Sequence, residues 1–166
     1  PLLLTARELA RPVVEAVREC MADYPANVHR GLHVLSERAT EAFEGARAKV
    51  ARYLGLGYPG GPAIDRVAME GDPGRVSFPR AMYHEGLDFS FSGLKTAVVN
   101  HVRKNPDAAT EDVAASFQEA VVDALTTKVR RAARDHGAKG IVLAGGVAAN
   151  SQLRERTLDI CMEDGF

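Results

Sequence analysis

The chain is poor in the features that mark several large classes of protein. Its two cysteines, Cys20 and Cys161, lie far apart with no Cys-x-x-Cys spacing. This pattern excludes a zinc ribbon and favours free thiols in a reducing compartment. The 21 basic and 22 acidic residues give a formal net charge of −1. The chain therefore has no global positive field that would attract nucleic acid, and a polyanion would need a local patch or a partner.

Long apolar runs and targeting signals are also missing. The opening residues 1–5 are too few for a signal peptide and have no basic residues ahead of them. No apolar run approaches the length of a membrane span. We therefore expect a cytoplasmic protein with no membrane partner. What the chain does contain, 166 residues of which 46% are hydrophobic, is enough to bury the core of one domain.

Periodicity predicts a helix-rich chain with few strands. Gly55–Gly61 is predicted to be a turn, because four glycines and a proline in seven residues support neither helix nor strand. Pro62 suits the first position of the helix that follows. Residues 71–90 are expected to be irregular. The expected helices cover residues 5–24, 36–54, 62–70, 93–101 and 110–136.

The longest expected helix, residues 110–136, has an apolar face and a basic end. Arg130, Arg131 and Arg134 crowd its last turns, together with Lys128. These cations either compensate the helix dipole or form a patch that contacts phosphates. The apolar face is formed by Val113, Phe117, Ala120, Val121, Ala124 and Leu125.

The most informative stretch covers residues 140–151. Ile141–Leu143 is a short apolar run, as expected of a buried strand. Gly145 and Gly146 follow and allow a ligand to approach the backbone. Asn150 is a strong candidate to cap the next helix, whose amino-terminal end favours an anion. A strand, two glycines and a helix therefore indicate a phosphate or nucleotide cradle, although an ordinary tight turn between strand and helix has the same pattern.

Two common nucleotide-binding motifs are absent from this stretch. The order Gly-Gly-x-x-x-Asn lacks the third glycine of the dinucleotide fingerprint. It also lacks the Gly-Lys-Ser/Thr ending of the P-loop. Neither of those folds is predicted.

Four segments, in the same order along the chain, resemble successive blocks of the tRNA adenosine threonylcarbamoyltransferase family. They are Gly55–Asp65, Leu87–Ala97, Val113–Val121 and Leu143–Ser151. Four ordered blocks are far more specific than any one of them. The resemblance covers about residues 50–156. It divides the chain into an incomplete transferase-like lobe, residues 50–166, and a helical segment of unassigned family, residues 1–49.

The resemblance implies a fold and an activity. The fold is α/β and helix-rich, a partial ribonuclease-H-like lobe of the actin-like ATPase superfamily, in which two lobes close over a nucleotide. Family members move the threonylcarbamoyl group from threonylcarbamoyl-adenylate to N6 of adenosine 37 in tRNAs that read codons beginning with A, which forms t6A. The implied partners are the adenylate, tRNA, other proteins of the t6A machinery, and a second chain in a homodimer or heterodimer.

Carried over from the family, the nucleotide contacts fall on Gly61, Asp65 and Asn150, beside the glycine turn Gly145–Gly146. Each residue also has a purely structural explanation. Gly61 suits a turn, Asp65 lies in a first helical turn where a carboxylate favours the dipole, and Asn150 is an N-cap residue.

One substrate contact of the family is missing from its expected place. Members have an Asp before a Lys, thirteen residues ahead of the second glycine of the Tyr-Pro-Gly-Gly turn, and here Ala48 precedes Lys49. Glu44 resembles this carboxylate displaced by four residues. That displacement is close to one helical turn, about 6 Å along the axis.

The family also binds iron or zinc, through two histidines spaced i, i+4 and an Asp near the carboxyl terminus. His29 and His33 have this spacing, but no complete ligand set is recognisable in the chain. We favour the simpler interpretation that the pair is two surface histidines beside a glycine.

Two other functions stay open besides the transferase. A catalytically silent interaction module would keep the family's contact surface while its cleft is dead. Another nucleotide-binding transferase or kinase of the actin-like superfamily would share the glycine turn alone.

Overall fold

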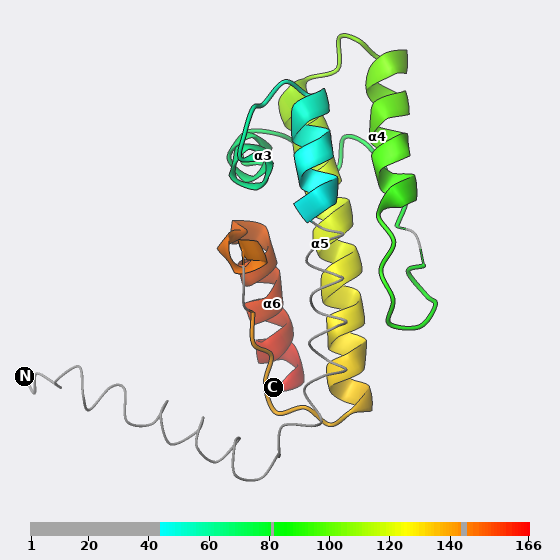
Figure 1. Cartoon of the computed structure of the whole chain (residues 1–166). Helices are drawn as coiled ribbons and strands as arrows, with labels where there is room; N and C mark the ends of the chain where they lie inside the picture. The colour runs from blue at the N-terminus through cyan, green and yellow to red at the C-terminus, as the bar shows by residue number, and fades with distance from the viewer. Residues whose placement is uncertain (1–43, 81, 144–145) are drawn as a thin grey trace, which may run out of the picture. The chain divides into compact units, whose positions relative to one another are not determined.

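The structure, a computed structural model, describes residues 44–80, 82–143 and 146–166 (Figure 1). All of these residues lie in one unit of the chain, Arg38–Phe166. The helix expected over residues 5–24 lies outside the described residues, and so do His29, His33 and Gly145.

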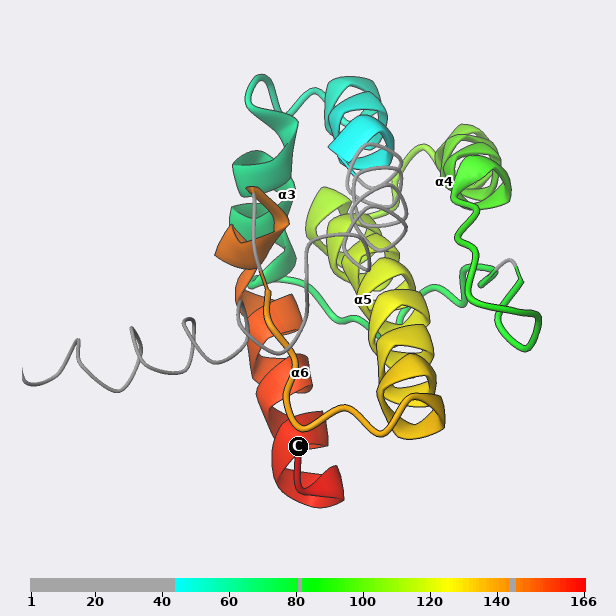
Figure 2. The ribbon, with the colours of Figure 1, turned by 60° about the horizontal axis from the view of Figure 1, so that its bottom comes forward.

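Helices make up the regular structure of the described residues, and most of them lie where periodicity predicts them. The long helix α5 lies in the centre of the ribbon, with α6 beside it (Figures 1 and 2). The expected helices over 36–54, 93–101 and 110–136 are confirmed where they are described, except that Leu54 and His136, at their ends, lie in turns. The helices are residues 44–53, α3 (Gly60–Ala68), α4 (Ser92–Lys104), α5 (Thr110–Asp135), the short 3-10 helix η1 (Gly146–Ala149) and α6 (Ser151–Asp164).

One helix crosses the expected boundary between the two parts of the chain. Residues 44–53 form one uninterrupted helix, so the expected division between residues 49 and 50 falls inside it. In the part of the chain that the structure describes, no helix combines the length and apolar character needed to cross a membrane.

Helix α3 begins earlier than the sequence predicts. We expected Pro62 at its first position, but the helix starts at Gly60 and Pro62 is its third residue. Proline is tolerated there because the amides of a first helical turn have no acceptor within the helix. Starting at Gly60 lets α3 lie against the preceding helix, since a Cβ on Gly60 would be 2.8 Å from the Cα of Ala48.

The expected strand Ile141–Leu143 is wrong for this structure. These residues have no regular secondary structure, and Val142 is 89% exposed. The physical reason is that a strand is stabilised by hydrogen bonds to a neighbouring strand, and the described residues contain none.

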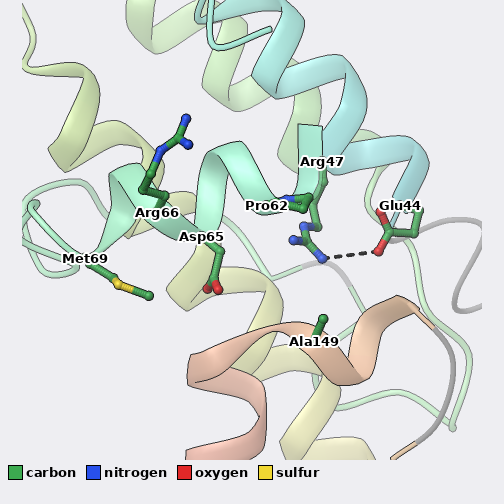
Figure 3. A pocket seen from close by; sticks show the side chains of 7 residues that line it. All are labelled: Glu44, Arg47, Pro62, Asp65, Arg66, Met69 and Ala149. Atoms are coloured by element: carbon green, nitrogen blue, oxygen red, sulfur yellow. Dashed lines mark hydrogen bonds and ion pairs between the residues drawn. The ribbon is translucent and has the colours of Figure 1, made fainter. Parts of the chain in front are cut away.

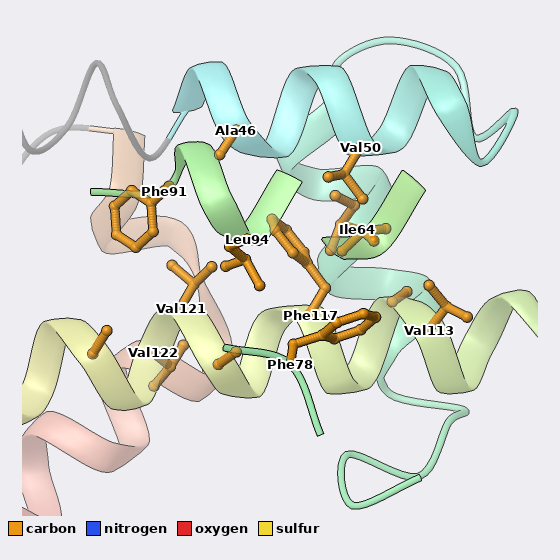
Figure 4. Close-up of a cluster of buried hydrophobic side chains, with 14 of the residues drawn as sticks. Ala46, Val50, Ile64, Phe78, Phe91, Leu94, Val113, Phe117, Val121 and Val122 are labelled. Atoms are coloured by element: carbon orange, nitrogen blue, oxygen red, sulfur yellow. The ribbon is translucent and has the colours of Figure 1, made fainter. Parts of the chain in front are cut away.

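The core is built around the apolar face of α5 (Figure 4). The predicted face is confirmed, because all six of its apolar residues are buried. Ile64 of α3, Leu94 of α4 and Val50 of the helix 44–53 pack into the same cluster. Two phenylalanines, Phe78 and Phe91, join it from the irregular segment between α3 and α4. Burial of these side chains therefore fixes three helices and one irregular segment against α5.

The irregular segment is also held to α5 by a buried cation, Lys128, which is only 2% exposed. Its ammonium donates to the backbone carbonyls of Glu85, at 2.8 Å, and Asp88. It also lies 5.6 Å from the ring centroid of Phe89. Arg131 adds a bond to the carbonyl of Tyr83, 3.2 Å away.

The other two arginines of the basic end join α5 to α6. The Nε atoms of Arg130 and Arg134 donate to Oδ2 of Asp164, at 2.8 and 2.7 Å. Hydrogen bonds from both guanidinium groups hold the pKa of Asp164 well below its usual range. The cations that we expected to compensate the dipole or to form a phosphate patch are thus engaged in contacts between elements.

We predict that Gly71→Ala destabilises the fold. A Cβ on Gly71 would lie 2.1 Å from the carbonyl oxygen of Glu111, so the backbone at the start of α5 would have to move. Such overpacking costs about 1–3 kcal/mol. The matched control is Gly93→Ala, where a Cβ meets nothing within 4 Å. Urea unfolding with unchanged m-values measures both, and equal midpoints for the two variants would contradict the assigned packing.

We also predict that Lys128→Met lowers the free energy of unfolding by about 2 kcal/mol, because it removes charge-assisted hydrogen bonds to two carbonyls. Lys49→Met, at an exposed position of the helix 44–53, is the control and should change little. Proteolysis within residues 82–91 should accelerate in the Lys128 variant alone. Equal cleavage rates in both variants would show that Lys128 does not hold this segment.

Candidate functional site

A hollow of about 370 Å³ lies beside α3 and contains the candidate site (Figure 3). Its walls come from the helix 44–53, from α3 and from the end of η1. We call it the α3 hollow, and it is lined by Glu44, Arg47, Pro62, Asp65, Arg66, Met69 and Ala149. Two cations, two carboxylates and three apolar side chains thus face one small volume.

Asp65 accepts four hydrogen bonds from other described residues. Its Oδ1 accepts from Gln118 Nε2 at 3.0 Å, from Asn150 Nδ2 at 3.1 Å and from Ser151 Oγ at 3.0 Å. Its Oδ2 accepts from the backbone N–H of Ser151 at 3.3 Å. One carboxylate therefore joins α3 to α5 and to the start of α6.

Asn150 has the structural role that the sequence offered as an alternative. It caps α6, because its side-chain oxygen accepts from the N–H of Leu153 at 2.8 Å. Its Nδ2 donates to Asp65 and to Gln118 Oε1, the latter at 2.9 Å. The residue is only 1% exposed. Direct contact between Asn150 and a nucleotide stays a prediction, while its hold on Asp65 is observed.

Gly61 is the point where α3 makes room for Arg47. A Cβ on Gly61 would lie 2.6 Å from Nη2 and 2.8 Å from Cζ of that arginine. The absence of a side chain therefore lets the guanidinium lie against the first turn of α3. A nucleotide that approached the backbone of Gly61 would meet Arg47 first.

Arg47 was not singled out from the sequence, yet it lines the α3 hollow and is only 4% exposed. Its Nη1 lies 3.2 Å from Oε1 of Glu44, one turn away on the same helix. Burial lowers the pKa of the guanidinium, and the carboxylates of Glu44 and Asp65 oppose that change. One sequence feature pointed to this region of the helix. The family has a carboxylate at the position of Ala48, and this chain has one four residues earlier, at Glu44.

The predicted nucleotide contacts thus converge, although not all of them are accessible. Asp65 lines the α3 hollow, Gly61 lies behind Arg47, and Asn150 lies behind Asp65. Gly146 starts η1, whose last residue, Ala149, lines the α3 hollow. The first turn of α3 and the end of η1 therefore lie at the same hollow.

The iron or zinc implied by the resemblance finds no ligand set in this part of the chain. Within residues 44–80, 82–143 and 146–166, no three His, Cys, Asp or Glu side chains converge as a metal would require. The described residues do not fit the ion.

Comparison with known proteins places the chain in a family. The family model described as tRNA N6-adenosine threonylcarbamoyltransferase matches residues 24–166. A protein of that name from Thermotoga neapolitana is 56% identical over 133 residues, which are 80% of this chain and 39% of that protein. The one from Kosmotoga olearia is 55% identical over 128 residues, 76% of this chain and 37% of that protein. The one from Caldicellulosiruptor saccharolyticus is 52% identical over 131 residues, which are 76% of this chain and 38% of that protein.

The match to the family model extends the resemblance in both directions. It includes residues 24–49, which the four sequence blocks left without a family, and it runs to residue 166. The chain spans less than two fifths of the length of these curated relatives, since the shares of their length are 39%, 37% and 38%. The family model matches most of the chain, and the chain therefore belongs to the tRNA N6-adenosine threonylcarbamoyltransferase family.

Proposed function

We propose that this chain takes part in t6A formation, the transfer of a threonylcarbamoyl group from threonylcarbamoyl-adenylate to N6 of adenosine 37 in tRNAs that read codons beginning with A. One observation carries the proposal beyond family membership. The first and last of the four family blocks, 85 residues apart at Asp65 and Asn150, meet through a hydrogen bond at one hollow. A sequence that kept the blocks for unrelated reasons would not need to bring them together beside an opening.

The proposed role of the chain is to supply one wall of the adenylate site. Curated relatives extend well beyond the matched part. We propose that residues 50–166 form part of a ribonuclease-H-like lobe of the actin-like superfamily, and that tRNA, other t6A proteins and a second chain complete the assembly in the cytoplasm. The iron or zinc that the family uses would take its ligands from outside the described residues, which present no cluster of three or more candidate ligands.

The side chains of the α3 hollow match the parts of an adenylate. Oδ1 of Asp65 accepts three hydrogen bonds, whereas Oδ2 accepts one, so Oδ2 retains the capacity to accept a ribose hydroxyl. Met69 and Pro62 offer apolar surface to a base. Holding the mixed anhydride in one orientation is the main contribution that such a wall makes to acyl transfer.

The silent interaction module is the second candidate, and one observation favours it. Asn150 and Asp65 are engaged with each other and with Gln118, so these residues have a sufficient structural reason to be present. In that case the α3 hollow would bind no adenylate.

Calorimetric titration with a non-hydrolysable analogue of threonylcarbamoyl-adenylate, whose anhydride oxygen is replaced by NH, separates the two candidates. We expect saturable heat with this analogue and much weaker binding of its guanosine counterpart. No heat with the adenosine compound, at protein concentrations that give a folded chain by circular dichroism, would refute the transferase role and favour the silent module.

For Asp65→Asn we predict an affinity for this analogue that is lower by about tenfold, since a charged acceptor for the ribose hydroxyl is lost. The control is Ser151→Ala, which removes one hydrogen bond to Asp65 but keeps its carboxylate. An equal loss in both variants would mean that Asp65 acts only through the stability of the network.

A further inference from the structure

We propose that Tyr58 is a stacking platform for an unpaired base of the RNA, close to the α3 hollow. The inference rests on the proposed function, because it assigns one contact of the tRNA to a surface near that site. The contact is made by the flat face of the tyrosine ring.

Tyr58 is the most exposed large hydrophobic side chain of the described residues, with 95% of its surface open to solvent. Tyr83 shows the contrast, because its hydroxyl lies 3.0 Å from Oγ1 of Thr127 and links the segment between α3 and α4 to α5. A ring that stays in water contributes little to the free energy of folding. Packing within the described part of the chain therefore does not explain an aromatic residue at position 58.

The turn that presents Tyr58 is anchored on both sides of it. The N–H of Leu56 donates to the carbonyl of Ala51 at 2.9 Å, and the leucine side chain packs against the core. The carbonyl of Pro59 accepts from the N–H of Ala63 at 3.3 Å. Figure 2 shows this turn at the top of the view, between the helix 44–53 and α3. Because the backbone already holds the ring toward solvent, stacking on it costs little conformational entropy.

The turn presents a single ring rather than an apolar patch. Gly57, immediately before Tyr58, has a positive φ of 81° and no side chain that could cover the ring. Protein partners bind contiguous apolar patches, which are larger than one side chain. A lone ring matches the face of one nucleobase, and aromatic side chains of RNA-binding proteins stack on unpaired bases in this way. The occupant that fits Tyr58 is therefore a base.

The position of the turn suits the proposed reaction, which needs an adenosine of the RNA near the adenylate. Pro62, which lines the α3 hollow, comes four residues after Tyr58. Four residues span at most about 14 Å when fully extended, so the Cα atoms of these two residues lie within that distance. A base stacked on Tyr58 is therefore held near the proposed adenylate wall.

Arg52 offers an ionic contact at the start of the same turn. Its carbonyl accepts from the N–H of Gly55 at 3.3 Å, and its side chain is exposed. A guanidinium there can contact a backbone phosphate, and the affinity gained from such a contact falls with salt because counterions are released. Stacking releases no counterion, so the contributions of Arg52 and Tyr58 can be separated by experiment.

The test measures the affinity of the chain for a fluorescently labelled anticodon stem-loop RNA that contains adenosine 37, by anisotropy at several salt concentrations. In Tyr58→Ala and Tyr58→Leu the affinity should fall by about tenfold, because neither side chain has an aromatic face. Tyr58→Phe should stay within about twofold of the parent chain. The slope of log affinity against log salt should be unchanged in these variants and shallower by about one in Arg52→Gln.

Fluorescence gives a direct measure of stacking, because the chain contains no tryptophan. Tyr58→Trp therefore introduces a single indole at the proposed platform. The stem-loop RNA should quench its emission, whereas a fully paired duplex of the same stem should not, since its bases are stacked on each other. Unchanged emission at saturating stem-loop RNA would overturn the inference.

Other outcomes also decide against it. Full RNA affinity in Tyr58→Leu would mean apolar packing rather than stacking. A loss in Tyr58→Ala that falls on the adenylate analogue, with the RNA affinity unchanged, would mean that the ring contacts the adenylate instead. Absence of RNA binding by the parent chain would refute this inference alone, because the calorimetric titration with the analogue decides the proposed adenylate site independently.

Discussion

The carboxylate of Asp65 is the constraint on which the rest of the site depends. A half-buried charge is costly unless donors surround it, and here they come from Gln118 on α5 and from Asn150 and Ser151 at the start of α6. Three helices must therefore keep one relative position for the charge to be satisfied. Asn150 links this arrangement to the start of α6, because the residue whose amide donates to Asp65 is also the N-cap of that helix. The hydrogen-bond network and the first turn of α6 are therefore fixed by the same side chain.

A second constraint acts at the other wall of the α3 hollow. There, Gly60 and Gly61 allow two parts of the helix 44–53 to lie close to α3. Gly60 lets the backbone of the helix 44–53 come close, at Ala48. Gly61 lets the side chain of Arg47 from that helix lie against α3. The same early start of α3 that contradicts the expectation at Pro62 is what brings both glycines into the first turn. This wall of the hollow therefore forms where the helix 44–53, with its buried Arg47, packs on the two glycines that begin α3.

Local patterns predicted the local parts of this structure. The apolar face of α5 and the cap at Asn150 depend on neighbours within a few residues, and both are confirmed. The strand Ile141–Leu143 was wrong because a strand depends on a second strand, which the described residues do not supply. Lys128 was missed as a structural residue because its acceptors, at Glu85 and Asp88, lie about forty positions earlier in the chain, with separations of 43 and 40. Periodicity contains no information on such contacts.

The residues of the candidate site also differ in how far the sequence predicted them. Asp65 and Asn150 were predictable as ligand contacts by resemblance, yet the structure gives each a sufficient reason in packing and capping. Arg47 was not predicted, because its place in the α3 hollow depends on the close approach of the helix 44–53 to Gly61, which no local pattern of the sequence records. Its guanidinium is buried and pairs with Glu44 one turn away on the same helix.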